Sequence, residues 1–294
     1  MQPLFRSNNS PYLKFIRGKS EAFYQASLLL AEDKQMLSWI LFAFWHGLNP
    51  FAFWEHLDGP AHFLRSWRNG LLFADGYEGE LTIPQNAALD LQGHFSSDIN
   101  EAILMVLNSL ESVGGAARFP TFQELFCFLD QYAGSIAQAS AQIIFREYLV
   151  GGQVENLEPL RQFGAYILWW ELLQRSGQLV QFAKLFIPLT DLQEFRVTEP
   201  ELLTEMKSPL IKRLTDYELN RIQVGFSDLK KQSASYPREM KDFLAVLCNY
   251  LSEEVNSALR SSWQLSLTEL PRKKNKMDWL IGGFTRFRTG LHTN

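Results

Sequence analysis

The amino-acid sequence predicts an all-α protein. Apolar residues recur at helical spacing along almost the whole chain, and no stretch shows the strict alternation of a half-buried strand. Hydrophobic residues make up 46% of the sequence and aromatic residues 14%, which is enough for a large core. No internal repeat or low-complexity linker divides the chain. We therefore expect a single domain over residues 1–294, with about the first 19 residues and the segment after about 265 at its periphery.

The net charge and the cysteines indicate which partners and which cellular compartment to expect. The formal net charge of −4 gives no support to nucleic-acid binding. Cys127 and Cys248 lie far apart in apolar helical patterns. We expect both to be buried free thiols in a reducing compartment.

The sequence also contains signals that bear on where in the cell the protein is found. The N-terminus lacks the features of a secretory signal, and no run of about 18 apolar residues predicts a spanning helix. The basic stretch at residues 272–276 is predicted to be a solvated loop, with a weak contact to anionic lipids as the alternative. We expect a cytoplasmic protein that is at most peripheral to the inner membrane.

Helical periodicity and turn residues divide the N-terminal part into helices over Ser20–Leu30, Glu32–Trp45, Phe51–Phe73 and Asp98–Ser112, and an irregular loop or short helix over Ala74–Gly93. Ser20 can cap the first helix because its side chain can accept a hydrogen bond from a free N–H of the first turn. Pro50 lacks a backbone donor and disfavours helical geometry at Asn49. The second helix should therefore end or bend at this point.

The C-terminal part carries clearer signals of where helices begin and end. Thr121 and Glu124 fit a capping box at the start of a long helix over Phe122–Tyr148. A long apolar helix is predicted within Phe163–Leu192, and Pro188 lies in the segment that ends it. Amphipathic helices complete the chain over Ser208–Ser235, Pro237–Leu259 and Met277–Phe287.

The apolar segment around Trp169 and Trp170 carries a recognisable frame. It consists of Gly164, Ile167, Leu172, Leu173, Lys184, Phe186, Ile187, Pro188, Asp191 and Leu192. This frame resembles the squalene/phytoene synthase family of head-to-head prenyltransferases, whose pattern runs G-x-A-L-Q-L-x-N-I-x-R-D-x-x-x-D and continues with R-x-Y-L-P and D-D/E-L. The resemblance implies an isoprenoid-synthase-like helical bundle around a central cavity.

Further segments resemble the same family in the same order. They are Phe23, Tyr24, Leu28, Leu29 and Leu41–Phe44 near the start, Thr121, Glu124, Leu125, Phe128 and Ala133–Ile136 in the middle, and the turn of Phe195 and Val197. Arg196 replaces the glycine of that turn. In the family, a small residue at the position of Gly134 lets substrate or a neighbouring helix approach closely. Either role is open here.

The carboxylates of the family's two aspartate-rich motifs are absent. Arg175 and Leu179 stand at the two aspartates of the central motif, and Asn49, Pro50 and Phe53 stand at those of the first motif. The resemblance implies that such aspartates, one turn apart on one helix face, hold magnesium ions that help a diphosphate leave. An arginine and a leucine cannot bind magnesium. We therefore expect no catalytic residue, no metal site and no cofactor.

The resemblance suggests these binding candidates around the cavity: Phe44, Trp45, Tyr132, Gly134, Gln138, Gly164, Leu168, Trp169, Glu171, Arg175 and Lys184. Leu168 and Glu171 replace a glutamine and an asparagine of the family pattern. Two roles are open for the tryptophans, which could line a pocket for a lipid tail or fill the vacated cavity. Filling is the simpler expectation, because each indole buries about 150–250 Å².

Other potential sites receive less support from the sequence. None of the five histidines pairs with another at a spacing that puts two ligands on one helix face. The carboxylate pairs Asp216/Glu218 and Glu253/Glu254 point apart on a helix, and we expect them on solvated faces.

Three functional hypotheses follow. The first is a catalytically inactive homologue that acts as a binding or assembly protein for an isoprenoid or other lipid, or for a protein partner such as a membrane enzyme complex. The family offers a precedent in a mitochondrial complex I assembly factor that resembles these synthases. The second is a divergent prenyl-diphosphate transferase that uses Arg175, Lys184 and Glu171, with magnesium, and predicts a hollow cavity. The third is the non-catalytic subunit of a heteromeric synthase with an active paralogue.

Overall fold

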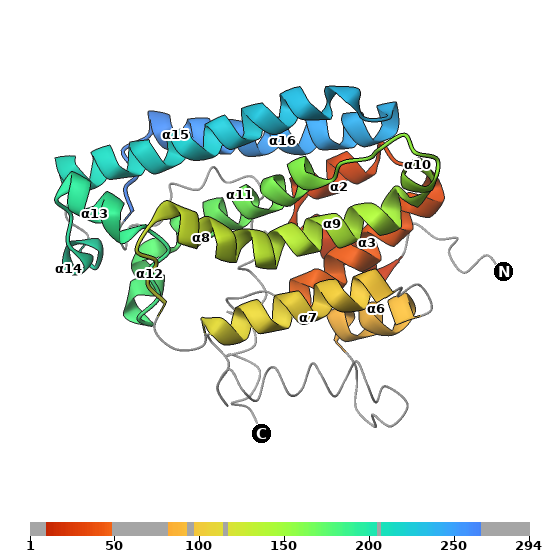
Figure 1. Ribbon diagram of the computed structural model, residues 1–294, viewed down its shortest axis with the longest axis horizontal. Helices are drawn as coiled ribbons and strands as arrows, with labels where there is room; N and C mark the ends of the chain where they lie inside the picture. Colours follow the sequence, from red (N-terminus) through yellow and green to blue (C-terminus); the bar gives the residue numbers. More distant parts are fainter. Residues whose placement is uncertain (1–9, 49–81, 93–96, 114–116, 205–206, 266–294) are drawn as a thin grey trace, which may run out of the picture. The chain divides into compact units, whose positions relative to one another are not determined.

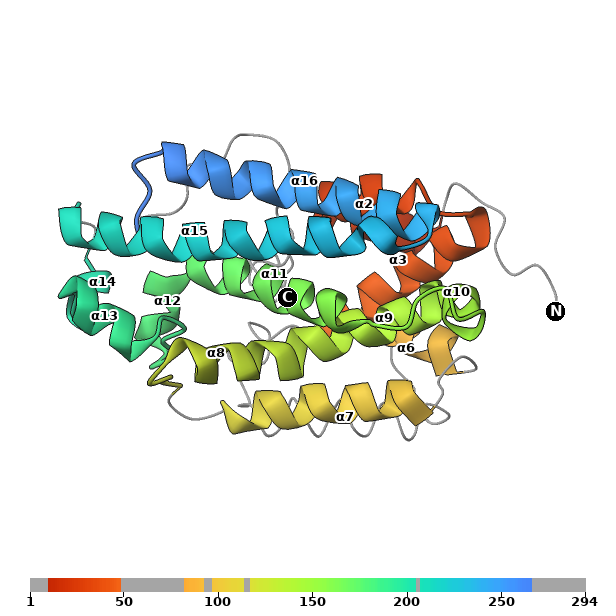
Figure 2. The ribbon, with the colours of Figure 1, turned by 45° about the horizontal axis from the view of Figure 1, so that its top comes forward.

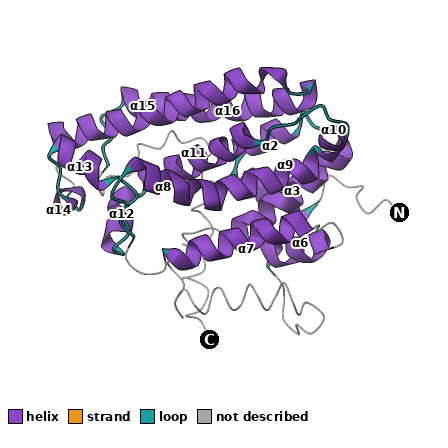
Figure 3. Cartoon of the chain, in the orientation of Figure 1, coloured by secondary structure: helices purple, strands orange, loops and turns teal. Residues whose placement is uncertain are grey.

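The computed structural model describes residues 10–48, 82–92, 97–113, 117–204 and 207–265 (Figure 1). The regular structure of these residues is helical (Figure 3), apart from an isolated bridge that pairs Ala117 with Lys184. The all-α prediction is therefore confirmed. The described residues fall into two compact units, the first ending at Ser97 and the second beginning at Asp98.

Several predictions fall outside the described residues. These are the helix over Phe51–Phe73, the replaced first motif at Asn49, Pro50 and Phe53, the basic stretch 272–276, and the helix over Met277–Phe287. Within the part of the chain that the structure covers, no helix has both the length and the apolar character needed to cross a bilayer.

The first unit contains four described helices: α1 (Pro11–Lys19), α2 (Glu21–Ser27), α3 (Glu32–Gly47) and α6 (Ile83–Gln92). The predicted cap is confirmed, because Ser20 Oγ accepts a hydrogen bond of 2.9 Å from the N–H of Phe23. Residues 11–19 form a helix that packs on α3 with Tyr12 and Ile16 buried. Tyr12 Oη also donates to Asp90 at 2.5 Å and so joins α1 to α6.

The second unit contains α7 from Asp98 onward and all later helices. Their bounds are α7 Ser97–Ser112, α8 Phe122–Leu129, α9 Ser135–Ile144, α10 Arg146–Val150, α11 Glu158–Gln174, α12 Ser176–Gln181, α13 Leu189–Phe195, α14 Glu199–Leu202, α15 Pro209–Gln232 and α16 Arg238–Arg260. Helix α11 packs on α8, α9 and α15, and α15 and α16 run side by side (Figures 1 and 2). The helix with the predicted apolar frame thus lies among the helices of this unit.

The predicted helix over Phe122–Tyr148 is divided in the structure. Its capping box is confirmed, since Thr121 and Glu124 bond to each other's backbone N–H groups. However, the chain forms one π-helical turn, η2, over Asp130–Gly134, and the helix breaks again at Phe145. A π turn inserts an extra residue, which spacing of apolar residues alone does not reveal.

One cysteine differs from expectation, and one residue of the turn after α13 has an unusual backbone conformation. Cys248 is buried but Cys127 is exposed, so the prediction of two buried thiols is wrong for Cys127. Helix α13 ends at Arg196, which has the left-handed backbone angles φ 55° and ψ 40°. This is the conformation that glycine adopts most easily, and Arg196 stands where the family pattern has glycine.

Candidate functional site

Helix α11 crosses the π turn and α9 at two glycines. A Cβ atom on Gly164 would clash with the carbonyl oxygen of Ala133 and lie 2.8 Å from Ala137 Cβ. A Cβ atom on Gly134 would lie 3.2 Å from the carbonyl oxygen of Arg161 and clash with the Asp130 side chain. In this fold both candidate residues therefore permit close approach of two helix backbones.

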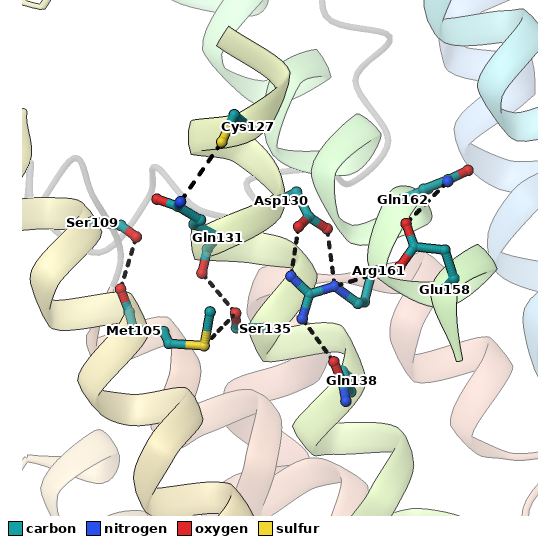
Figure 4. Close-up of polar contacts among 10 residues, drawn as sticks. All are labelled: Met105, Ser109, Cys127, Asp130, Gln131, Ser135, Gln138, Glu158, Arg161 and Gln162. Carbon is teal, nitrogen blue, oxygen red and sulfur yellow. Dashed lines mark hydrogen bonds and ion pairs between the residues drawn. The ribbon is translucent and has the colours of Figure 1, made fainter. Parts of the chain in front are cut away.

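Arg161 holds the π turn against α11 (Figure 4). Its guanidinium donates to Asp130 through Nη2 at 2.5 Å and Nε at 3.2 Å, and Nη1 donates to Gln138 Oε1 at 2.7 Å. Asp130 begins the π turn and Gln138 lies one helical turn beyond its end. The candidate Gln138 thus uses its side-chain oxygen in this bridge. Tyr132, inside the π turn, is buried.

The adjacent tryptophans of α11 contact different neighbours. Trp169 is fully buried, and its Nε1 donates to the backbone oxygen of Phe186 at 3.3 Å. The Trp170 ring meets Trp263 edge to face with centroids 6.0 Å apart, and its Nε1 donates to Glu254 Oε2 at 3.5 Å. Both indoles are packed against protein groups. Leu168, before them, is also buried.

Two carboxyl groups lie near the C-terminal end of α11. Burial raises the pKa of Glu171 well above its ordinary value; the Arg175 guanidinium opposes this rise and Glu254 adds to it. Burial raises the pKa of Glu254 to about 7, against the lowering effect of the Trp170 hydrogen bond. Burial also raises the pKa of Tyr132, with a smaller contribution from Glu171. The side chains of Glu171 and Glu254 still keep part of their surface accessible.

Sequence reasoning missed Glu254. It was expected on a solvated face together with Glu253, but only Glu253 is exposed, and it pairs with Arg260 at 2.9 Å. The prediction for Glu254 is wrong because this residue borders the apolar stripe of α16. Leu251 lies three residues before it and Ala258 four residues after it, and both are buried. That spacing is the signal that could have identified Glu254.

The helix is interrupted where the family pattern has its two aspartates. Helix α11 ends at Gln174, Arg175 has φ −116° and ψ 12°, and α12 begins at Ser176. Arg175 is 7% exposed and Leu179 is 3% exposed. Figure 1 shows α12 directed away from the axis of α11. The two positions therefore no longer share a face of one continuous helix.

The donor atoms at this position do not fit magnesium. The ion requires several oxygen ligands, usually carboxylates with substrate phosphates, whereas the guanidinium of Arg175 and the alkyl chain of Leu179 supply none. Throughout the residues that the structure describes, no group of three or more His, Cys, Asp or Glu side chains is arranged to hold a metal ion.

Lys184 takes part in the contact between the segment after α12 and the end of α7. Its Nζ donates to the backbone oxygen of Val113 at 2.5 Å, and the residue is 4% exposed. Burial lowers the pKa of Lys184, and the nearby charge of Arg118 lowers it further. Its ammonium group thus binds a backbone carbonyl at the end of α7.

A second charged cluster was also missed. Arg221 Nη1 donates to Asp191 Oδ2 at 2.9 Å and to Glu218 Oε2 at 3.2 Å, and its guanidinium lies 4.2 Å from the ring centre of Phe122. Glu218 is fully buried, and burial raises its pKa well above the ordinary value, so the prediction of a solvated face is wrong. This cluster ties α13 to α15 and has the character of a structural ion pair.

The remaining two candidates belong to the first unit. Phe44 and Trp45, both buried in α3, have ring centroids 4.6 Å apart. Trp45 Nε1 is buried without a hydrogen-bond partner among the described residues. Both rings belong to α3.

Comparison with known proteins shows that the fold is similar to that of solved synthase structures. No protein-family model matches the chain. A 15-cis-phytoene synthase of Synechocystis sp. is 21% identical over 243 residues, which cover 76% of this chain and 68% of that protein. A crystal structure of a dehydrosqualene synthase in complex with a ligand matches with a TM-score of 0.71 and 15% identity, covering 92% of this chain and 91% of that chain. A squalene synthase from Alicyclobacillus acidocaldarius matches with a TM-score of 0.65 and 16% identity, covering 86% of this chain and 93% of that chain.

Proposed function

Because the chain has the fold of the squalene/phytoene synthase family, we propose that it is a non-catalytic relative of these synthases that acts as a binding or assembly protein. A shared fold does not fix the chemistry, which depends on the side chains at the site. The proposal therefore rests on the end of α11.

The observation that carries the proposal is the break in the helix at Arg175. In a metal-dependent synthase, two carboxylates one turn apart would hold magnesium, and the metal would stabilise the departing diphosphate. Here the two corresponding side chains are a buried arginine at the break between α11 and α12 and a buried leucine within α12. These features favour the loss of the magnesium-assisted step in which a diphosphate leaves its substrate.

The apolar interior is suited to a lipid or to a structural role. We propose an isoprenoid or other lipid as the ligand, with a protein partner such as a membrane enzyme complex as the alternative. A subunit role beside an active paralogue also fits a protein that lacks the metal ligands, and co-purification of a paralogue with synthase activity would identify that role.

The test is direct. Purified protein is incubated with farnesyl or geranylgeranyl diphosphate and magnesium, and head-to-head products and released diphosphate are measured. A phytoene synthase is assayed in parallel as the positive control. We expect neither product nor diphosphate release from this protein.

Turnover would contradict the proposal and favour the divergent transferase. Two variants would then decide whether the activity belongs to this site. Arg175→Ala and Glu171→Gln should abolish genuine turnover, whereas the exposed Glu253→Gln should retain it. Activity that survives in the first two variants would come from a contaminating enzyme.

A further inference from the structure

The polar groups between the end of α11 and the adjoining part of α16 suggest which lipid could bind. Trp170 contacts both Trp263 and Glu254, so the two helices meet at this point. Glu171 interacts electrostatically there with Arg175 and with Glu254. Resting on the proposed function, we propose that this region binds the hydroxyl group of an isoprenoid alcohol in preference to a diphosphate.

The charge of the cluster argues against a diphosphate. Arg175 is the cation that interacts with Glu171, and the cluster also contains the carboxyl groups of Glu171 and Glu254. A diphosphate carries several negative charges, and transferring it from water into a buried site is unfavourable unless cations compensate them. One guanidinium compensates only part of that charge, and each carboxyl group that ionises reduces the compensation further. An uncharged hydroxyl group avoids this penalty.

Unpartnered polar atoms provide an independent argument. Trp263 is 3% exposed and Ser176 is 5% exposed. The Nε1 atom of Trp263 and the Oγ atom of Ser176 are buried without a hydrogen-bond partner among the described residues. Buried polar groups are nearly always hydrogen-bonded, so such an orphan donor indicates that a further group is bound in the functional state. A hydroxyl oxygen can accept from the indole N–H.

The carboxyl groups complete this arrangement. Part of the Glu171 and Glu254 side chains remains accessible, so a ligand head group can reach them. The pKa of Glu254 is raised to about 7 by burial, which leaves a substantial share of protonated carboxyl near neutral pH. A carboxyl group in either state can accept a hydrogen bond from an alcohol, and the protonated form can also donate one.

Calorimetric titrations of the full chain with farnesol and with farnesyl diphosphate, both without magnesium, test the preference. We expect farnesol to bind and farnesyl diphosphate to bind at least about ten-fold more weakly, because the diphosphate is incompletely compensated. Equal or tighter binding of the diphosphate overturns this inference, and so does the absence of farnesol binding. Neither result bears on whether the protein turns over a diphosphate with magnesium, so failure of the proposed function is recognised separately.

A variant tests the indole N–H. Trp263→Phe keeps an aromatic ring but removes the donor, and we expect it to weaken farnesol binding about three- to ten-fold. The matched control is Trp39→Phe in the first unit, which loses the 2.8 Å hydrogen bond to Ser27 but leaves the proposed site intact. Titrations are made well below the melting temperature of each variant. Wild-type affinity in Trp263→Phe contradicts the assignment.

Discussion

The indole nitrogen of Trp170 donates to Oε2 of Glu254 at 3.5 Å, across the contact between α11 and α16. This bond stabilises the ionised carboxylate, but burial dominates and raises the pKa of Glu254 to about 7. The interior of a helical bundle thus contains a carboxyl group that titrates near neutral pH. Its protonation should affect both stability and ligand binding.

Glu254→Gln should reduce the pH dependence of stability. The pKa of Glu254 rises from 4.5 in the unfolded chain to about 7 in the folded protein. The folded state therefore binds the proton more tightly, and its stability falls as the pH rises through this window. The wild type should lose about 2–3 kcal/mol of unfolding free energy from this group between about pH 4.5 and 7.5, and Glu254→Gln should not.

Urea unfolding at a series of pH values measures this difference. Glu253→Gln is the control, because Glu253 is exposed and forms a surface pair with Arg260. We expect its pH profile to match the wild type. A Glu254→Gln profile parallel to that of the wild type would mean that Glu254 does not change its proton affinity on folding.

Arg196→Gly should stabilise the protein. Arg196 ends α13 with φ 55°, a left-handed conformation that is unfavourable for residues with a Cβ atom. Glycine relieves this strain but increases the entropy of the unfolded chain, so we expect a net gain of about 0.5–1 kcal/mol in unfolding free energy. Arg196→Ala keeps the strain and should give no gain. A gain of the same size in both variants would assign the effect to the arginine side chain.

Gly164→Ala should destabilise the second unit. The added Cβ would clash with the carbonyl oxygen of Ala133, and two packed backbones must separate to accept it. We expect a loss of about 1–3 kcal/mol in thermal or urea unfolding. Gly18→Ala in α1 is the control, since its Cβ meets nothing within 4 Å and alanine favours a helix. Equal effects in the two variants would contradict the close helix crossing.

Asp191→Asn should destabilise the contact of α13 with α15. The Asp191 side chain is 8% exposed, and its loss of charge leaves Arg221 with only Glu218 as its carboxylate partner in this cluster. We expect a loss of about 1–3 kcal/mol, because the Arg221 guanidinium loses a charged hydrogen-bond partner but keeps Glu218. Asp228→Asn removes the exposed pair with Lys231 and should change stability by less than about 1 kcal/mol. Urea unfolding of both variants checks the difference.

Much of the fold could be predicted from residue patterns. The Ser20 cap, the Thr121 capping box and the bounds of α7, α15 and α16 agree with the structure to within a few residues. These features depend on neighbours along the chain, so local spacing contains the necessary information. The family resemblance added the fold, which the structural comparisons support.

Less of the candidate site could be predicted. The replacement of the aspartates by Arg175 and Leu179 is visible in the sequence, but the break between α11 and α12 is not. The resemblance grouped Lys184 with Glu171, whereas the structure bonds Lys184 to Val113. The spacing of Leu251 and Ala258 places Glu254 beside the apolar stripe of α16, but it does not show that Trp170 meets this face.

The sequence by itself determined most of the helices, the caps at Ser20 and Thr121, and the absence of carboxylates at the central motif, because each of these depends on residue type and short spacing. Only the tertiary structure decided that Glu218 is buried and Glu254 half-buried while Glu253 is exposed. Neighbouring positions on a helix point in different directions, and what each one meets depends on helices distant in sequence. The proton affinity of a carboxyl group follows from those neighbours and from the loss of water around it.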